Sequence, residues 1–300
     1  MNIIITGASG FVGVNLTNYL KDSNEIKPLS VRYEPNQSFE LNGDVIIHLA
    51  GKAHDLKKAP IPQDYYDANF ELTKQMFDGF LTSNASKFIF LSTVKAVADT
   101  VDGILSETSI PDPKTHYGTA KHQAEQYMLN QKIPDGKQVY ILRPCMIHGP
   151  GNKGNLNMLY QLVAKGLPWP LGAFENQRSF LSIENLCFVV KELLENSNIP
   201  SGVYQIADDK SLSTNELIQV LGTTLGTKIR IWPIPIFWIK GIAQLGDYLH
   251  LPLNLERLQK LTENYVVSNQ KIVKTMGKKL PVSAEDGLMI TFNSFKNRIK

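Results

Sequence analysis

The stretch TGASGFVG, residues 6–13, follows a short apolar run and leads into an amphipathic segment. Its glycines have the spacing of a phosphate-binding turn between a strand and a helix, which predicts dinucleotide binding. In such a unit the first glycine makes the tight turn, the second admits the pyrophosphate, and the third lets the helix pack on the strand. The helix N-terminus adds free N–H donors and the positive end of its dipole. The cofactor-binding residues predicted in this loop are Gly7, Ser9, Gly10, Phe11, Val12 and Gly13.

Downstream of this loop, short β-branched runs alternate with longer segments of helical periodicity. Strands are predicted at Asn2–Thr6, Glu25–Val31, Asp44–Ala50, Lys87–Thr93 and Gln138–Pro144, and helices at Gly10–Lys21, Asp64–Thr82 and His116–Gln131. Near-continuous apolar strands that alternate with helices are typical of a parallel sheet covered on both faces. We therefore predict an α/β fold with a doubly wound Rossmann sheet. The segment between Arg32 and Asp44 is short for a further strand and helix, so we expect a trimmed sheet edge.

The texture of the sequence changes after Gly149, where glycine- and proline-rich segments alternate with the strand-like elements Ser179–Ile183 and Val203–Ala207. We predict a Rossmann NAD(P)-binding domain over residues 1–150, completed by about 178–207. Residues 151–177 and 208–300 are predicted to form a smaller, discontinuous C-terminal substrate lobe. Such a lobe would cover the carboxyl ends of the strands, where open α/β folds bind ligands.

The composition narrows the class of partner. The 300 residues have a formal net charge of +3 and no dense basic run, so we expect no nucleic acid partner. Cys145 and Cys187 are too few for a disulfide framework and lack metal-ligand spacing, so we expect buried thiols, no metal and a reducing cytoplasm. The apolar stretch from Ile231 is broken by Pro233, Pro235 and Lys240, and we interpret it as a loop that feeds a helix, with membrane contact only a minor alternative.

The end of the second strand bears on the choice of cofactor. An acidic side chain about 20 residues after the glycine loop usually binds the adenosine ribose. Here the sequence reads LSVRYE, so Ser30 or Arg32 stands where an aspartate is expected. Arg32 suits a 2′-phosphate, although Glu34 could still reach the ribose and Arg32 could be a solvated surface charge. We favour NADP(H) over NAD(H).

The segment YGTAK, from Tyr117 to Lys121, carries the chemistry. Residues four apart lie on one helix face, so the ammonium group can stand near the phenol and favour its ionised form. A phenol with a lowered pKa can exchange a proton with a substrate hydroxyl or carbonyl. Ser92 and Thr93 lie at the carboxyl end of a predicted strand, where a hydroxyl can bind the same oxygen.

These motifs together resemble the extended short-chain dehydrogenase/reductase superfamily, and within it the NAD-dependent epimerase/dehydratase family of nucleotide-sugar enzymes. The matching segments are TGASGFVG, DVIIHLAGKAH, YYDANFELTK, FIFLSTVKA, YGTAK, ILRPCMIHGPG and NQRSFLSIENL, which run over nearly the whole chain. The combination of STVKA, GPGNKGN, GLPWPLG and NQRSF is most similar to UDP-glucose 4-epimerase-like proteins, a group that also contains UDP-4-keto-6-deoxyhexosamine 4-reductases.

The resemblance implies roles for the matching residues. Tyr117 would be the acid/base, Lys121 its pKa modulator and ribose ligand, and Thr93 the hydroxyl of the triad. Leu49, Ala50, Gly51, Asn69 and Pro144 would line or brace the cofactor, beside Arg32, Tyr117 and Lys121. Thr93, Asn155 and Arg178 would bind the substrate, and the guanidinium of Arg178 suits its pyrophosphate. A homodimer and a UDP-linked sugar substrate are implied as well.

Departures from the family pattern leave several functions open. Val94 and Lys95 replace the Asp-Glu pair of the dehydratases, and Met146 and His148 replace residues common in the epimerases. We favour an NADPH-dependent reductase of a UDP-4-keto(-6-deoxy)hexose or hexosamine. A UDP-hexose(amine) 4-epimerase that retains NAD uses the same triad and stays the alternative. A non-catalytic, NADP-sensing Rossmann protein is the distant one.

Overall fold

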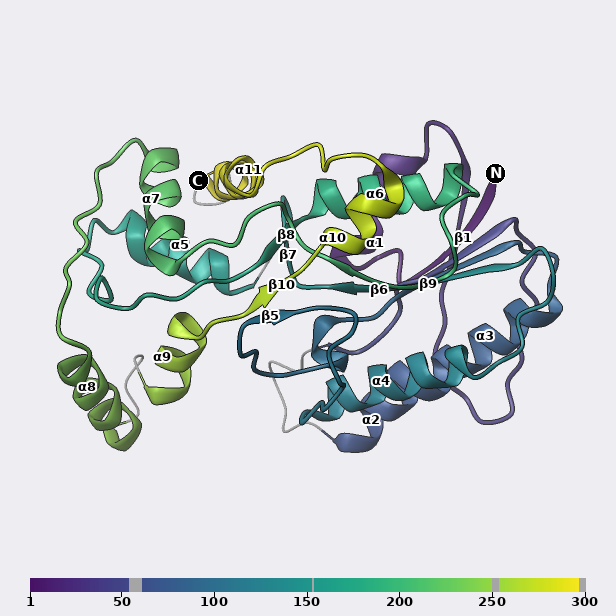
Figure 1. Ribbon diagram of the computed structural model, residues 1–300, viewed down its shortest axis with the longest axis horizontal. Coiled ribbons are helices and arrows are strands. Elements are labelled where there is room, and N and C mark those ends of the chain that lie inside the picture. The colour runs from purple at the N-terminus through teal and green to yellow at the C-terminus, as the bar shows by residue number, and fades with distance from the viewer. Residues whose placement is uncertain (54–60, 153, 250–253, 297–300) are drawn as a thin grey trace.

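The computed structural model of the protein describes residues 1–53, 61–152, 154–249 and 254–296 (Figure 1). Its centre is a six-stranded parallel sheet in the order β2-β1-β3-β4-β6-β9. These strands are β1 (Asn2–Thr6), β2 (Glu25–Leu29), β3 (Val45–His48), β4 (Lys87–Leu91), β6 (Gln138–Pro144) and β9 (Gly202–Ile206). The fold is therefore of the α/β Rossmann type, as predicted.

Side chains of these strands alternate between two cores, one on each face of the sheet. Ile3 and Ile5 pack in one core with Ile47 of β3, whereas Ile4 packs in the other with Ile46. All five are at most 6% exposed, because both faces are covered by helices. This double burial explains why β1 and β3 are nearly continuous apolar runs.

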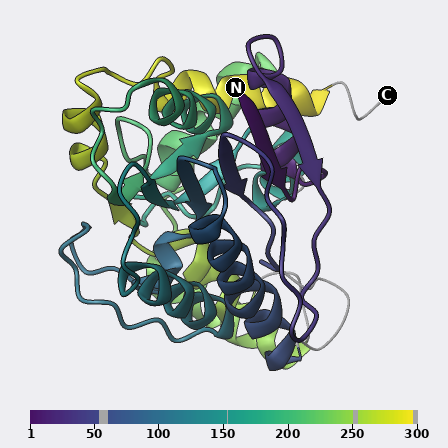
Figure 2. The same ribbon diagram turned by 90° about the vertical axis from the view of Figure 1, so that its right-hand side faces the viewer.

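Helices cover both faces of the sheet (Figures 1 and 2). The first face carries α1 (Phe11–Leu20), α6 (Ile183–Glu195) and α10 (Gln270–Met276), whose apolar residues share one core. The second face carries α3 (Leu72–Thr82) and α4 (His116–Leu129), with α2 (Pro62–Tyr66) next to α4. Between α2 and α3 the chain makes a π-helical turn at Asp67–Glu71. The predicted single helix over Asp64–Thr82 is wrong at this point.

The predicted bounds of β1 and β6 are confirmed, whereas three other strands end earlier than predicted. The last residue of β2, Leu29, pairs with Thr6, where β1 gives way to the glycine loop. Beyond that point β2 has no backbone partner to continue the ladder. No described residue from 30 to 44 is helical or part of a strand, so β2 is an edge strand and the trimmed edge is confirmed.

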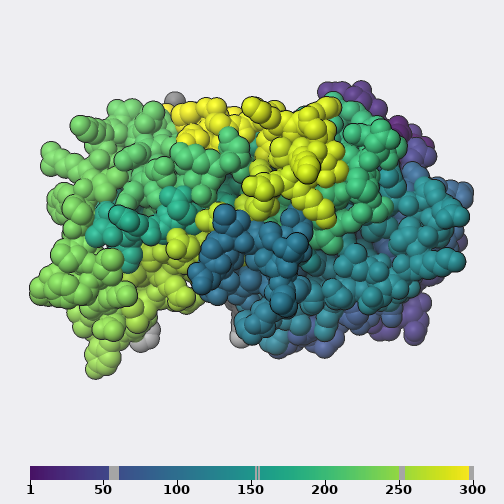
Figure 3. Space-filling view, in the orientation of Figure 1, coloured from purple at the N-terminus to yellow at the C-terminus, as the bar shows by residue number. Residues whose placement is uncertain are grey.

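A second hydrophobic core lies beyond the sheet. It joins α5 (Asn155–Ala164), α7 (Thr214–Leu225), α8 (Ile236–Leu249), α9 (Leu255–Thr262) and α11 (Ala284–Lys296). Two short parallel pairs, β7 (Met146–His148) with β8 (Phe180–Ser182) and β5 (Ile104–Leu105) with β10 (Val266–Val267), connect this region to the sheet. In Figure 3 the green segment with α7 and α8 forms the end of the molecule opposite the purple N-terminal strands. The predicted domain boundaries stay a prediction.

Within the described ranges, no helix is long and apolar enough to cross a membrane. The same ranges contain no group of three His, Cys, Asp or Glu side chains that could hold a metal ion. Cys145 and Cys187 are both buried and free.

Candidate active site

The glycine loop after β1 is seated against the loop after β3. Gly7 has a φ of +69°, and a Cβ there would lie 2.8 Å from the backbone nitrogen of Ala50. A Cβ on Gly13 would lie 2.3 Å from the carbonyl oxygen of Gly7. Both positions therefore need glycine. The loop sits between β1 and β3, where the strand order reverses and open α/β sheets bind their ligands.

The first turn of α1 follows this loop without a side-chain cap. Gly10 is the N-cap, and its backbone N–H donates to the carbonyl of Gly7 at 3.0 Å. The ring of Phe11 lies close to Gly151 of the loop after β7, while Val12 packs on the first core and Ser9 is exposed. The N-terminus of α1 is thus a set of backbone donors bordered by small residues, an arrangement that suits an anion.

Asn69 braces the loop after β3 from the π-helical turn. Its amide nitrogen donates to the carbonyl oxygens of Lys52 and Tyr65, at 3.0 and 2.9 Å, and its amide oxygen accepts from the backbone nitrogen of Lys52 at 3.2 Å. A Cβ on Gly51 would lie 2.5 Å from the amide oxygen of Asn69 and 3.3 Å from Nζ of Lys121. The structure therefore brings Leu49, Ala50, Gly51, Asn69 and Lys121 together at one edge of the sheet.

His48 connects this edge to the interior, and the sequence analysis missed it. Its Nδ1 lies 2.7 Å from the hydroxyl of Thr6, and its Nε2 lies 3.1 Å from the hydroxyl of Thr73. Thr6 in turn accepts from the backbone nitrogen of Ala50 at 3.2 Å. Burial lowers the pKa of His48 to about 3, and the nearby charge of Lys121 adds to the effect. The sequence signal that could have indicated this network is the histidine that ends the apolar run of β3.

Thr93 and Tyr117 meet at the carboxyl edge of β4. Thr93 caps the 3-10 turn Val94–Ala96, where its hydroxyl accepts from the backbone nitrogen of Lys95 at 3.2 Å. A hydrogen bond joins the side chains of Thr93 and Tyr117. A Cβ on Gly118 would lie 2.4 Å from the carbonyl oxygen of Lys95, so glycine is what lets α4 approach this turn. The predicted pair of hydroxyls is thus assembled by close backbone packing.

The predicted lowering of the Tyr117 pKa is wrong for this arrangement. Burial raises the pKa of Tyr117 to about 12, and the hydrogen bond from Thr93 opposes that rise only in part. The charge of Lys121 is engaged elsewhere, because its Nζ donates to the carbonyl oxygen of Leu91 at 2.9 Å and lies 4.5 Å from the ring centre of Phe90. The phenol is therefore held neutral, which suits a proton donor.

Lys121 is a buried ammonium with few polar neighbours. It is 3% exposed, and burial lowers its pKa to about 7, while the carboxylate of Glu125 opposes that shift. Glu125 follows one helical turn later and is itself fully buried. Lys121 can therefore gain or lose its proton near neutral pH.

Glu125 anchors a charged network that the sequence analysis did not predict. The guanidinium of Arg143 donates from Nε to both carboxylate oxygens at 3.0 and 3.1 Å, and from Nη2 at 2.5 Å. The hydroxyl of Ser92 also donates to this carboxylate. Because α4, β6 and the residue that follows β4 each contribute one member, the network fixes the Lys121 helix on the sheet. No sequence signal marked it, since its members are 18 and 33 residues apart.

The tip of β2 carries no acidic residue immediately after the strand. Ser30, Arg32 and Glu34 are all exposed. The backbone carbonyl of Glu34 accepts from the side chain of Gln75 on α3 at 2.8 Å, which ties this segment to the second face of the sheet. Contact of Arg32 or Glu34 with a cofactor stays a prediction.

Pro144, Arg178 and Asn155 are the three remaining predicted ligands. Pro144 is buried at the end of β6, where it pairs with Ile206 of β9. Arg178 donates to the carbonyl oxygen of Lys260 and forms an ion pair with Glu263 at 3.6 Å. Its charge also has a small influence on the pKa of Lys95. Burial lowers that pKa most, the carboxylates of Asp99 and Glu263 raise it, and Arg178 lowers it further. Asn155 is the first residue of α5, and its side chain lies outside what the structure describes.

Lys95 lies in the 3-10 turn that follows Thr93. Its ammonium donates to the carbonyl oxygen of Asp99 at 2.6 Å and lies 4.5 Å from the ring centre of Tyr265. The hydroxyl of Tyr265 donates to the carbonyl of Ala98 at 2.6 Å. This turn therefore presents a cation, not a carboxylate, beside Thr93.

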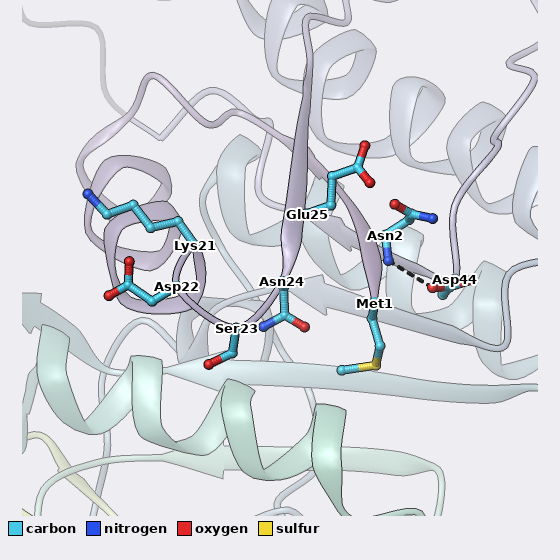
Figure 4. Close-up of a pocket in the computed structure, with 8 residues that line it drawn as sticks. All are labelled: Met1, Asn2, Lys21, Asp22, Ser23, Asn24, Glu25 and Asp44. Carbon is cyan, nitrogen blue, oxygen red and sulfur yellow. Dashed lines mark hydrogen bonds between the residues drawn. The ribbon is translucent and has the colours of Figure 1, made fainter.

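A polar surface pocket of about 500 Å³ lies at the opposite edge of the sheet (Figure 4). It is open and is lined by Met1, Asn2 and the turn from Lys21 to Glu25, with Asp44 accepting from the backbone nitrogen of Asn2 at 2.7 Å. These residues border the amino ends of β1 and β2. Ligands of open α/β sheets bind at the carboxyl ends, so we do not assign this pocket to the active site.

The chain is similar to known proteins in sequence and in fold. The sequence profile of the "NAD dependent epimerase/dehydratase family" matches residues 34–207. A UDP-glucose 4-epimerase of Vibrio cholerae is 29% identical, over 98% of this chain and 95% of that protein. The N-acetyl-alpha-D-glucosaminyl-diphospho-ditrans,octacis-undecaprenol 4-epimerase of Escherichia coli O157:H7 is 28% identical, over 91% of this chain and 85% of that protein. The structure of RMD from Pseudomonas aeruginosa complexed with NADPH has a TM-score of 0.75 at 22% identity, with 99% of both chains covered, and shows the shared fold.

Proposed function

The chain belongs to the NAD dependent epimerase/dehydratase family, and from this premise we propose that it exchanges a hydride and a proton at C4 of a nucleotide-linked sugar. The observation that carries the proposal is the assembly of Thr93, Tyr117 and Lys121 at the carboxyl edge of the sheet, next to the glycine loop. The named relatives act on UDP- or diphosphate-linked sugars, which supports a sugar diphosphate as substrate.

Each member of this triad has a separate task. The neutral phenol of Tyr117 gives its proton to the C4 oxygen, and the same phenolate takes the proton back in the reverse direction. Thr93 binds the same oxygen and shares a hydrogen bond with the phenol. Lys121, whose pKa is lowered to about 7, holds an exchangeable proton on the side of Tyr117 where we place the cofactor. A bound nicotinamide dinucleotide supplies or accepts the hydride.

The residues of the loop fit such a dinucleotide. Gly7 and Gly13 leave no room for a Cβ, and α1 begins without a side-chain cap, so backbone N–H groups are left to meet a pyrophosphate. Gly51 and Asn69 border the same edge beside Lys121. We assign the pyrophosphate of the sugar nucleotide to Arg178, which would have to leave Glu263 to bind it. Asn155 and Pro144 keep the roles that the resemblance implies, and the homodimer stays a prediction.

The direction that we propose is reduction by NADPH. Arg32 is exposed and is one of the two residues that stand where the ribose-binding acid is expected, and its guanidinium can pair with a 2′-phosphate. A cofactor that binds and leaves in each cycle suits a one-way reduction. The substrate would then be a UDP-4-keto(-6-deoxy)hexose or hexosamine.

The second candidate is a 4-epimerase that retains NAD. It is favoured by the two relatives that are named as 4-epimerases and align with nearly the whole chain. The same triad would serve both halves of that reaction, so the side chains of Thr93, Tyr117 and Lys121 do not separate the two candidates.

One set of measurements separates them. The purified full chain is denatured, its released nucleotide is identified by mass spectrometry, and fresh protein is assayed with NADPH or NADH on a UDP-4-keto sugar. Reduction predicts an empty or exchanging site and consumption of NADPH in proportion to the 4-hydroxy product. Tightly bound NAD, together with equilibration of C4 epimers without added cofactor, would replace the reductase by the epimerase.

Arg32→Ala tests the cofactor preference. It should raise KM for NADPH at least about tenfold, in line with the loss of one charge-assisted phosphate contact, and leave KM for NADH nearly unchanged. Lys21→Ala, at an exposed cation that follows α1 at the opposite edge of the sheet, is the control and should change neither value.

A further inference from the structure

The helix α8 leaves a broad apolar surface uncovered. Its buried residues are Ile239, Ala243 and Gly246, which recur at helical spacing and face the rest of the lobe. Six other residues of the helix are exposed by 51 to 82%, and we call them the outer face of α8: Phe237, Trp238, Ile242, Leu245, Tyr248 and Leu249. At 100° per residue these six cover an arc that starts beside the buried stripe at Ile242 and reaches the opposite side at Tyr248 and Phe237.

This outer face is a connected aromatic and aliphatic surface. The rings of Phe237 and Trp238 lie 4.7 Å apart, and Trp238, Ile242, Leu245 and Leu249 follow one another at intervals of three or four residues. Soluble monomers seldom expose contiguous apolar patches of this kind unless the patch binds something. The lobe itself needs only the inner stripe of α8, so the outer face is not explained by packing within this chain.

The charge around α8 points to an anionic partner. From Lys228 to Thr262 the chain contains five Lys or Arg residues and two acidic residues, a net charge of +3. The whole chain also has a net charge of +3, so all other residues together are balanced. The basic residues Lys228, Arg230 and Lys240 are exposed. The excess positive charge of the protein therefore lies in the stretch of chain that contains α8 and α9, with Lys240 on α8 itself.

A lipid surface fits this combination better than a protein surface does. Trp, Tyr and Phe side chains flanked by lysines are typical of helices that lie in the interface of a bilayer. With 14 residues α8 is about 21 Å long, which is too short to cross a membrane and long enough to lie flat on one. In Figure 1, α8 forms the end of the molecule farthest from β1, so a flat surface can reach it without touching the sheet.

We propose that the outer face of α8 docks the protein on an anionic lipid bilayer. The aromatic and aliphatic side chains enter the headgroup region, and the surrounding lysines and arginines meet the lipid phosphates. Docking holds the second lobe at a membrane while the carboxyl edge of the sheet keeps its chemistry. This inference does not depend on the reaction at C4, and it replaces the expectation that no membrane takes part.

Vesicle flotation of the full chain tests the proposal. We expect the protein to float with vesicles of three parts phosphatidylcholine and one part phosphatidylglycerol, and to float less with phosphatidylcholine alone or at high salt. The double variant Trp238→Gln/Leu245→Gln should lose at least tenfold in vesicle affinity. Ile110→Gln changes an exposed isoleucine that is far from α8 in the sequence. It is the matched control and should bind like the wild type. Thermal melts check that each variant is folded.

Two further readouts decide between occupants. In a Trp232→Phe background, brominated lipids should quench the fluorescence of Trp238, and adding Trp238→Phe should remove most of that quenching, because the remaining Trp169 is buried. Tyr117→Phe should float like the wild type, which separates this inference from the proposed reaction. Failure to bind either vesicle would overturn the proposal. So would a concentration-dependent dimer that the double variant dissociates, since a second copy would then be the occupant.

Discussion

The carboxyl edge of the sheet and the outer face of α8 depart from the usual distribution of side chains in opposite directions. At the sheet edge Lys121 and Glu125 are buried, whereas on α8 Trp238 and Tyr248 are exposed. Buried charge costs free energy because it loses water, and exposed apolar surface costs free energy because it orders water. Each region therefore holds side chains in the less favourable environment. A ligand at the sheet edge would therefore offset the cost of burying charged groups. A ligand on the outer face of α8 would offset the cost of exposing apolar side chains to water.

The largest expected effect is the loss of the acid/base at the sheet edge. Tyr117→Phe should lower kcat by about 10²- to 10⁴-fold, because no other described side chain replaces the proton donor. Binding of cofactor, measured by fluorescence titration, should be retained. Tyr127→Phe is the control on the same helix, since that phenol only donates to Asp78 at the surface. Equal activity of the Tyr117 variant and the wild type would remove the triad from the mechanism.

A pair of isoleucines on α8 separates its two faces. Ile239 is 2% exposed and Ile242 is 51% exposed. Ile239→Ala should lower the free energy of unfolding by about 2–5 kcal/mol, because it leaves a cavity in the second core. Ile242→Ala should change it by less than about 0.5 kcal/mol. Chemical denaturation measures both, and similar losses for the two variants would mean that the outer face is packed within this chain.

Gly118 tests whether close packing assembles the triad. Gly118→Ala places a Cβ 2.4 Å from the carbonyl oxygen of Lys95, so α4 must move away from the turn after Thr93. We expect kcat to fall by roughly 10- to 100-fold, as a displacement of about 1 Å does elsewhere. Gly241→Ala is the matched control, since a Cβ there meets nothing within 4 Å. That variant should stabilise α8 by up to about 1 kcal/mol and leave kcat unchanged.

The last prediction concerns the proton of Lys121, whose effect on stability builds up gradually with pH. Its pKa is about 7 in the folded protein and 10.5 in an ordinary environment. Between these values the unfolded chain binds the proton and the folded chain does not, so stability rises with pH in that window. The slope is at most about 1.4 kcal/mol per pH unit. Lys121→Met should flatten this rise in melts recorded from pH 7 to 10, and an unchanged slope would mean that Lys121 stays charged.

Sequence periodicity predicted most of the sheet because both of its faces are buried. Ile3 and Ile4 point to different cores, and both are apolar. A strand that is buried on both faces therefore shows up in the sequence as an unbroken apolar run. The π-helical turn escaped prediction because it depends on Asn69, whose amide bonds the backbone of Lys52 some distance along the chain. The spacing of apolar residues along a helix does not reveal that one turn contains an extra residue.

The site was predicted only where its residues lie in short motifs. Tyr117 and Lys121 share a motif, and Thr93 ends a strand. Glu125 and Arg143 belong to no common motif, since a helix and a strand bring them together only in the folded sheet. The stretch from Ile231 was interpreted as a loop that feeds a helix, and α8 confirms that helix. The sequence could not tell which side of α8 the lobe covers, because apolar residues occur on both sides.

The pairing of β6 with β9 bears on how the chain is synthesised. β6 ends at Pro144, and its outer partner begins about 60 residues later at Gly202. At about 5–20 residues per second a ribosome takes roughly 3–12 seconds to deliver that partner. During this interval β6 is an uncovered sheet edge on a nascent chain, open to pairing with a neighbouring chain. Polysomes that translate this protein should therefore depend on chaperones that bind before Gly202 emerges.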